Sequence, residues 1–238
     1  KEVGTGGNWF PMILGGAMSQ LYGNRVTGIY QTDAEAAANG EPQKKAGDYI
    51  FEDTNGDKVV DAKDKVVLSH LQPKFTFGFN NSFAYKNFDL SILLVGSYGN
   101  DIVNEFRKYN ITMNGLWTPT RAAWEQRWKG PGQGNVIDKP SENSGSYIRD
   151  YANSMWVENG SYLRVRDITL GYTMPAGVLK AIRLSGLRIY ASAQNFLTIT
   201  KYTGYDPEAS WSATSINGWD RGVYPSAKSV TVGVKVNF

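Results

Sequence analysis

The most constraining feature of this sequence is the alternation of aromatic and small residues over residues 75–98. In the segment FTFGFNNSFAY the odd positions are almost all aromatic, whereas the even positions carry Thr, Gly, Asn, Ser and Ala. A period of two is typical of a β-strand whose two faces meet different surroundings. After Lys86 and Asn87 the alternation resumes in FDLSILLVGSY. The two segments therefore predict a β-hairpin joined by a two-residue turn.

The distribution of large and small side chains over the two faces of this hairpin favours a hairpin that spans a membrane. One face is nearly a wall of aromatic and aliphatic side chains, and the other is small, polar and almost uncharged. Each strand also has about the 9–11 residues that cross a bilayer at a tilt. Lipid outside and a crowded polar lumen inside explain both faces. The hairpin taken alone leaves open a large soluble β-sandwich or barrel with an aromatic core.

Further strands are predicted at 162–174, 187–198 and 230–238, with a weaker one at 22–30, which makes about six in all. Leu163 and Val165 are out of phase with Ile168, Leu170 and Tyr172, so we expect a bulge near Asp167. Short helices are predicted at 32–39, from the capping pair Thr32 and Glu35, and over 175–183. A third helix is expected from Thr118 as N-cap and Pro119 as first residue, ending before 130–132.

The connections between these strands alternate strictly in length. They are long at 31–73, short at 86–87, long at about 100–160, short at 174–186 and long at 200–226. Bacterial outer-membrane barrels have short periplasmic turns and long external loops. A sandwich has no reason to keep this rhythm. We therefore predict an all-β fold, an antiparallel transmembrane β-barrel segment with long extracellular loops, with Phe238 at the periplasmic rim.

Composition excludes several classes of function. The 238 residues contain no cysteine, which rules out disulfides and thiolate chemistry, and the net charge of +3 is scattered without a basic run, so no nucleic-acid partner is expected. No apolar run approaches the roughly 18–20 residues of a membrane helix. The sequence opens without an initiator methionine or a signal peptide, so we expect it to be the interior of a longer chain.

Several blocks of the sequence, in this order, resemble the C-terminal end of SusC-like (SusC/RagA family) TonB-dependent outer-membrane transporters. The blocks are GDYIFEDTNGDKVVDAKD, PKFTFGFNNSFAYKNFDLSILLVGSYGNDI, NGSYLRVRDITLGYTMP, LRIYASAQNFLTIT followed by GYDPE, and YPSAKSVTVGVKVNF. The resemblance covers nearly everything from about Tyr22 onward. It implies a bacterial outer-membrane location, a 22-stranded barrel with an internal plug, energy coupling through TonB, and a SusD-like surface lipoprotein that closes over the barrel mouth.

About six strands cannot enclose the lumen of such a transporter. Residues 1–238 are therefore expected to be the C-terminal portion of the barrel, with the plug, the TonB-contacting segment and the earlier strands outside this chain. The resemblance implies oligosaccharides as substrates, with peptides as the alternative. It also implies that the terminal aromatic residue Phe238 is a signal for the barrel-assembly machinery, although Phe238 could simply anchor the last strand at the membrane interface.

One loop has the spacing of a calcium site. Six residues stand at positions 1, 3, 5, 7, 9 and 12 of an EF-hand-like loop, one of them offering a backbone carbonyl: Asp53, Asn55, Asp57, Val59, Asp61 and Asp64. Lys58 replaces the usual glycine of that loop, and Asp64 replaces the bidentate Glu. Calcium, or less readily magnesium, is the predicted ligand, and a solvated turn rich in Asp and Asn is the alternative. A bound ion would stiffen an outer loop.

Tryptophans are the candidate ligand contacts of the long connections. Flat aromatic rings can stack on sugar rings or dock a partner lid, but tryptophans in large loops also pack the loops together. The candidates are Trp117, Trp124, Trp128, Trp156, Trp211 and Trp219. Arg164 and Arg166 could contact an anionic ligand or the plug, and a structural charge network is the favoured interpretation.

No catalytic constellation is present, because His70 is the only histidine and no nucleophile-base or acid pair appears. An enzyme is therefore not expected. The leading prediction is the barrel portion of an active importer. A SusC-like structural barrel subunit of a larger envelope complex and a soluble calcium-dependent glycan-binding β-domain are the alternatives.

Overall fold

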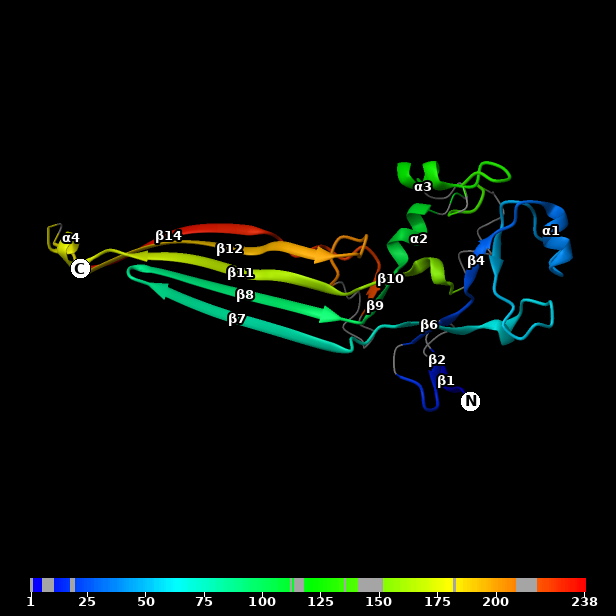
Figure 1. Cartoon of the computed structure of the whole chain (residues 1–238), viewed down its shortest axis with the longest axis horizontal. Coiled ribbons are helices and arrows are strands. Elements are labelled where there is room, and N and C mark those ends of the chain that lie inside the picture. The colour runs from blue at the N-terminus through cyan, green and yellow to red at the C-terminus, as the bar shows by residue number, and fades with distance from the viewer. Residues whose placement is uncertain are drawn as a thin grey trace.

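The protein, described by a computed structural model, combines one long β-sheet with a folded region at one end of that sheet (Figure 1). The structure describes residues 2–5, 11–17, 20–111, 113, 118–134, 136–140, 152–181, 183–208 and 218–238. The sheet is antiparallel and has the strand order β14-β12-β11-β8-β7. Its strands are β7 (Phe75–Tyr85), β8 (Phe88–Tyr98), β11 (Tyr162–Thr173), β12 (Gly186–Thr200) and β14 (Ser229–Asn237).

The predicted hairpin is confirmed with the expected bounds. β7 and β8 pair from Phe75 opposite Tyr98 to Tyr85 opposite Phe88, and only Lys86 and Asn87 lie between them. Lys86 has a φ of 53°, the left-handed conformation that two-residue hairpin turns require.

The predicted bulge is confirmed as well. The register of β11 against both β8 and β12 shifts between Val165 and Asp167. Val165 then pairs with Leu94 and Ile168 with Ile92, so the apolar residues before and after the bulge share one face of the sheet. The extra residue at this point absorbs the change of phase seen in the sequence.

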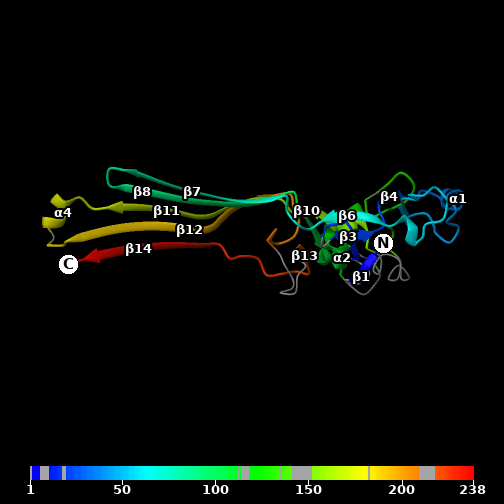
Figure 2. The same ribbon diagram turned by 90° about the horizontal axis from the view of Figure 1, so that it is seen from below.

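The apolar face of the sheet is uncovered. Phe79 and Val232 are 57% and 73% exposed, and no second layer lies on the described strands in either view (Figures 1 and 2). Aromatic rings gather at both ends of this face: Phe75 stacks on Tyr98 with centroids 5.3 Å apart, and Phe88 lies 4.7 Å from Tyr172. Aliphatic side chains fill the space between them, namely Leu90, Ile92, Leu94, Val165, Ile168, Leu170, Val230 and Val232.

Short and long connections lie at opposite ends of the sheet, as expected. The Lys86 turn, the helix α4 (Ala176–Ala181) and the C-terminus lie at one end (Figure 1). The other end carries the loop region, which we define as the described parts of residues 2–74, 99–161 and 201–228. None of the described helices has the length and apolar character needed to cross a membrane.

The expectation of a strand over 22–30 in the large sheet is wrong. The segment is interrupted at Asn24 and Arg25 and forms two short strands, β3 (Gln20–Gly23) and β4 (Val26–Ile29). These pair with β6 (Val66–His70) and β5 (Tyr49–Phe51) inside the loop region. The large sheet described here therefore has five strands rather than six. A two-stranded sheet of β1 (Glu2–Thr5) and β2 (Pro11–Ile13) precedes them.

The loop region has its own hydrophobic core. Its remaining elements are α1 (Asp33–Ala38), η1 (Ala62–Asp64), β9 (Asp101–Asn104), α2 (Glu105–Ile111), α3 (Arg121–Gln126), η2 (Ser154–Trp156), β10 (Val157–Asn159) and β13 (Trp219–Asp220). β9 pairs antiparallel with β10 and parallel with β13, which ties together segments far apart in the sequence. Leu21, Val103 and Trp156 are fully buried in this core. The long connections thus fold as a unit.

Two of the predicted helices are confirmed and one has a different start. α1 begins after Thr32, whose hydroxyl accepts the Glu35 N–H at 3.1 Å, and α4 occupies the predicted turn. The helix predicted from Thr118 begins instead at Arg121, because Thr120 supplies the cap by accepting the Ala123 N–H at 3.2 Å. Thr120 offers the same hydroxyl as Thr118 two residues later, beyond the proline.

Candidate functional site

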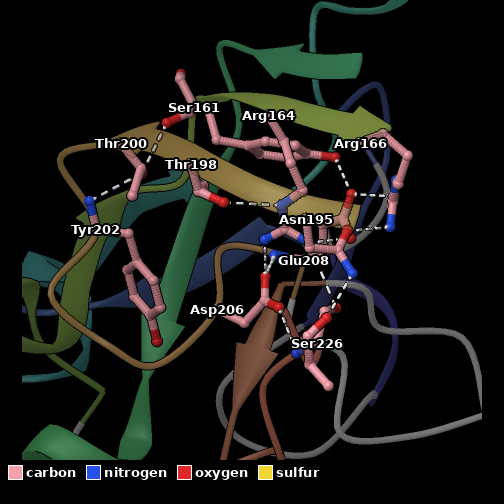
Figure 3. Close-up of polar contacts among 12 residues, drawn as sticks. Ser161, Arg164, Arg166, Asn195, Thr198, Thr200, Tyr202, Asp206, Glu208 and Ser226 are labelled. Atoms are coloured by element: carbon pink, nitrogen blue, oxygen red, sulfur yellow. Dashed lines mark hydrogen bonds and ion pairs between the residues drawn. The ribbon is translucent and has the colours of Figure 1, made fainter. Parts of the chain in front are cut away.

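A buried charge network joins the polar face of the sheet to the loop region (Figure 3). Arg164, on β11, is only 2% exposed. Its guanidinium contacts the Asp206 carboxylate at 2.5 Å and the Glu208 carboxylate at 2.8 Å. Arg166 reaches the other oxygen of Glu208 at 2.6 Å. The network therefore holds the segment after β12 against the polar face of the sheet.

Neutral groups complete this network. Arg164 Nε donates to Thr198 Oγ1 at 2.9 Å on the neighbouring strand, and Tyr162 donates its hydroxyl to Glu208 at 2.7 Å. Burial raises the pKa of Asp206, but hydrogen bonds from Arg164 and from the Ser226 N–H lower it further than burial raises it, so its pKa lies below the ordinary value. Asp206 is thus held as a carboxylate, and the interpretation of the two arginines as a structural charge network is confirmed.

A second ion pair crosses the polar face of the sheet nearer the short turns. Arg188 on β12 donates from Nη2 to Asp89 on β8 at 2.5 Å, spanning the intervening strand β11. Gly171 lies between them, and a Cβ at that position would collide with both partners. Glycine on β11 therefore leaves room for the pair, whose charged ends would have to shift to accommodate a side chain at this position.

The predicted calcium loop is held by hydrogen bonds from its own backbone. Asp53 accepts the N–H groups of Gly56 at 2.7 Å and Lys58 at 2.8 Å, and Asp57 accepts that of Val59 at 2.9 Å. Asn55 accepts the Asp57 N–H, and Asp61 accepts that of Lys63. Lys58 has a φ of 63°, so it adopts the left-handed conformation for which an EF-hand loop uses glycine.

Asp64 lies inside this loop and is buried. Its carboxylate accepts the Asp61 N–H at 2.8 Å and the Thr54 N–H at 2.9 Å, and the hydrogen bond from Asp61 is the main cause of its lowered pKa. Among the described residues, no three carboxylate or histidine side chains converge closely enough to hold a metal ion. The arrangement is that of an Asp-rich turn, and the calcium hypothesis stays a prediction.

The described tryptophans have different roles. Trp156 is fully buried, so it stabilises the loop core and presents no face to a ligand. Trp128 and Trp219 pack against the same core, and Trp219 donates to Glu105 at 2.6 Å. The Arg127 guanidinium lies 3.4 Å from the ring centroid of Trp124 and covers one face of the ring. Trp124 is nevertheless 52% exposed, so the rest of its surface is available to a ligand or partner. Trp117 and Trp211 lie outside the described residues.

The remaining candidates are at the surface. His70 is exposed, and its Nδ1 lies 3.1 Å from the amide nitrogen of Gln20. Phe238 is 96% exposed beside the short turns, where its carbonyl oxygen accepts the Ser185 hydroxyl at 2.9 Å. This position agrees with an anchoring role at the membrane interface, and the assembly signal stays a prediction.

A cleft of about 500 Å³ in the loop region was not predicted from the sequence. α2, α3 and the segment after β12 line it, and the rings of Phe106 and Tyr205 lie 5.5 Å apart at its wall. The described residues offer no hydrogen-bond partner to the side-chain amides of Asn110 and Gln126, which also line the cleft. Its cation, Arg107, is paired with Glu158 at 3.3 Å. No local sequence signal could identify this cleft, because its walls come from three distant segments.

Known proteins match this chain over most of its length. It is 31% identical over 235 residues to TonB-dependent receptor P3 of Formosa agariphila, a match that covers 94% of this chain and 22% of that protein. It is 29% identical over 204 residues to TonB-dependent receptor SusC of Bacteroides thetaiotaomicron, covering 84% of this chain and 18% of SusC. The chain is homologous to TonB-dependent receptors. It spans about a fifth of the length of these relatives. No protein-family model matches it.

Solved structures support the same fold. The RagAB peptide importer in its open-open state aligns with a TM-score of 0.69 at 22% identity, over all of this chain and 24% of the importer chain. A structure of the RagAB peptide transporter aligns with a TM-score of 0.65 over 92% of this chain and 22% of the other. The homology to TonB-dependent receptors and the uncovered apolar face described above therefore agree with each other.

Proposed function

We propose that this chain is the C-terminal part of the outer-membrane barrel of a TonB-dependent importer. The observation that carries the proposal is the uncovered apolar face of the sheet, bounded at each end by aromatic rings. Transmembrane barrels have such a face, with an apolar band about 25 Å tall between two aromatic girdles. The five strands have 9–15 residues, which meets the roughly 9–11 needed to span a bilayer.

The edges of the sheet support barrel closure. β7 and β14 each pair with one neighbour among the described strands, so each has a free row of backbone groups. A membrane does not tolerate an open sheet edge, because lipid offers those groups no hydrogen bonds. In our proposal β7 and β14 pair with strands outside this chain. The loop region then lies at the external mouth, and the charge network of Arg164 faces the lumen.

We propose oligosaccharides as the substrates, delivered with a SusD-like lipoprotein that closes over the mouth. The cleft in the loop region supports this proposal, since it combines aromatic rings, uncommitted amides and a neutralised cation, which suits an uncharged polar ligand. Peptides are the second candidate, because the aligned RagAB structures are those of a peptide importer. Import energy would come through TonB.

Uptake by cells that produce the full-length protein containing this chain tests these proposals. We expect labelled neutral oligosaccharides to accumulate only when TonB is present, and Gln126→Ala together with Tyr205→Ala to reduce their uptake. Arg121→Ala is the matched control, because Arg121 lies on the same helix with its side chain 91% exposed and outside the cleft. Uptake of labelled peptides instead would favour the second candidate. Membrane insertion without uptake of either would favour a structural barrel.

The calcium loop belongs to this proposal as a stabilising element. If Asp53, Asp57 and Asp61 exchange their backbone hydrogen bonds for a cation, calcium should raise the thermal stability of the full-length protein, and Asp57→Asn should weaken the effect. A calcium titration without any response would leave the Asp-rich turn as the whole explanation of this motif.

A further inference from the structure

A hollow lies on the apolar face of the sheet at its loop end. It has a volume of about 530 Å³, within the range of roughly 300–1,000 Å³ typical of ligand pockets. Large side chains of the apolar face that line it come from four adjacent strands: Phe75, Phe77, Tyr98, Leu163 and Ile199. By the register of the sheet, these side chains continue the outward, apolar face. Residues at alternate strand positions and in the adjoining loop complete the lining: Ser97, Asn159, Ser161, Tyr162, Thr200 and Lys201.

Gly96 shapes one wall of the hollow, because its lack of a side chain lets the Phe77 ring lie close to the backbone of β8. This residue pairs with Phe77 on one side and with Leu163 on the other, where a larger residue would fill the face. The Phe77 ring leans over it, so closely that a Cβ at Gly96 would collide with the ring. The hollow therefore has aromatic and aliphatic walls on the apolar face, and polar residues, Asn159 and Ser161, line it at its loop end.

The hollow is open and cannot be filled by a neighbouring barrel strand. Phe75, Tyr98 and Ile199 remain more than half exposed. A further strand would pair beside β7, at the edge of the sheet, and would not lie over its outer face. In a barrel this position is at the outer aromatic girdle, where lipid headgroups meet the acyl chains.

Cations stand at the rim of the hollow. Lys201 lines it and follows directly after the end of β12, two residues beyond Ile199. Lys74 stands before β7, where its aliphatic stem lies against Gly99. Both lysines are exposed, neither forms an ion pair with a described acidic residue, and no acidic side chain is among the lining residues. The site thus joins an apolar groove to uncompensated positive charge.

We propose that this hollow binds a phosphorylated, multiply acylated glycolipid of the outer leaflet. An acyl chain would lie in the hollow between Phe77 and Ile199, and a phosphate would pair with Lys201, assisted by Lys74. Charge complementarity selects an anionic lipid, because a lysine near an anionic headgroup contributes about 1 kcal/mol, or about fivefold in affinity. This inference depends on the proposed function, since it requires the apolar face to meet lipid.

Native mass spectrometry of the full-length protein in detergent tests the site, with purified lipid A, enzymatically dephosphorylated lipid A and phosphatidylglycerol as probes. We expect lipid A to bind about fivefold more weakly to Lys201→Gln than to the unaltered protein. Dephosphorylated lipid A should bind weakly, and with equal affinity, to Lys201→Gln and to the unaltered protein. Lys228→Gln is the matched control, because Lys228 is an exposed lysine just before β14, also at the loop end of the sheet, and does not line the hollow. This variant should bind lipid A as tightly as the unaltered protein.

Each other outcome contradicts a defined part of the inference. Equal binding of lipid A before and after dephosphorylation, or equal effects of Lys201→Gln and Lys228→Gln, would overturn the site. Tighter binding of phosphatidylglycerol than of lipid A would reject the glycolipid as its occupant. If the protein were absent from the membrane fraction, the barrel proposal itself would fail. A membrane protein that imports oligosaccharide yet shows no lipid preference would lose only this further inference.

Discussion

Arg164 shows how much one side chain can fix where the sheet meets the loop region. Its guanidinium is buried between two carboxylates on the segment after β12, and Thr198 accepts its remaining Nε hydrogen. Removal of one partner from a buried ion pair leaves the others charged and without compensation. The residues that carry this pairing come from two separate blocks of the sequence, the strand YLRVRD and the loop motif GYDPE.

Arg164→Met should therefore destabilise the loop region by about 3–5 kcal/mol, the cost typical of a broken buried ion pair. Arg166→Met is the matched control, because Arg166 contacts the same Glu208 but its side chain is 38% exposed. We expect this variant to lower the free energy of unfolding by about 1 kcal/mol or less. Pulse proteolysis of the full-length protein in detergent measures both. Similar losses for the two variants would mean that burial of Arg164 does not govern its contribution.

Asp138 provides a pH-dependent test within the loop core. Burial and the nearby Asp48 carboxylate raise its pKa to about 7, from an unfolded value near 3.9. Between these values the folded protein binds more protons than the unfolded chain, so stability declines as the pH rises from about 4 to about 7 and then levels off. Asp138→Asn should flatten this decline and be the more stable protein at pH 8.

The measurement is the stability of the loop region against proteolysis between pH 4 and pH 8. The difference between the two proteins should be of the order of a few kcal/mol at pH 8, given about 1.4 kcal/mol per pKa unit. Glu125→Gln, which neutralises an exposed acid on α3, controls for the change of charge alone. Parallel pH profiles for Asp138→Asn and the unaltered protein would show that Asp138 titrates normally.

At the scale of elements, alternation along each strand separates an apolar face from a polar face, which in the proposed barrel meet lipid and the lumen. On β14, Val232 pairs with Ala191 on the apolar face, and Thr231 pairs with Ser192 on the polar face. Arginine on the lipid face near the bilayer midplane costs about 2–4 kcal/mol, whereas lumen positions tolerate charge. Val232→Arg should therefore impair barrel insertion, and Thr231→Arg, one residue away, should not.

Heat modifiability on gel electrophoresis and recovery in the outer-membrane fraction report insertion of these two variants. Equal recovery of both would mean that the Val232 face does not meet lipid. The reverse order, with Thr231→Arg the more damaging, would place the polar face outward and overturn the assignment of the two faces.

The large strands could be predicted from the sequence because each carries its own period-two signal. The hairpin bounds, the bulge after Val165 and the end at which each connection lies all follow from such local patterns. The segment 22–30 also has strand-forming residues, but its pairing depends on β5 and β6, which follow it by about 20 to 45 residues. A strand's partner is set by tertiary packing, which a local pattern does not encode.

The candidate sites likewise divide into those set by local sequence, which could be predicted, and those set by tertiary contacts, which could not. The Asp-rich turn was visible in the sequence, because its hydrogen bonds are local. The partners of Arg164 lie 42 and 44 residues away, so its charge could be read from the sequence but its contacts could not. The cleft and the hollow beside Phe77 arise only when distant segments meet, and neither has a sequence motif.

At the scale of the whole molecule, the sheet and the loop region have opposite requirements. The loop region buries its own core around Leu21, Val103 and Trp156, as a water-exposed unit does. The sheet instead leaves one broad apolar face and two strand edges uncovered, which in water are sites of association. The proposed barrel meets both requirements, because a bilayer would cover the apolar face and neighbouring strands would pair with the two edges.

This contrast predicts how residues 1–238 behave when produced alone. In buffer without detergent they should form polydisperse oligomers, because the apolar face and the edges of β7 and β14 remain free to associate. Detergent should reduce this association, since it covers the apolar face. Size-exclusion chromatography with light scattering measures both states. A monodisperse monomer in plain buffer would instead support the soluble β-domain, because a single protein layer with that much exposed apolar surface cannot stay dispersed in water.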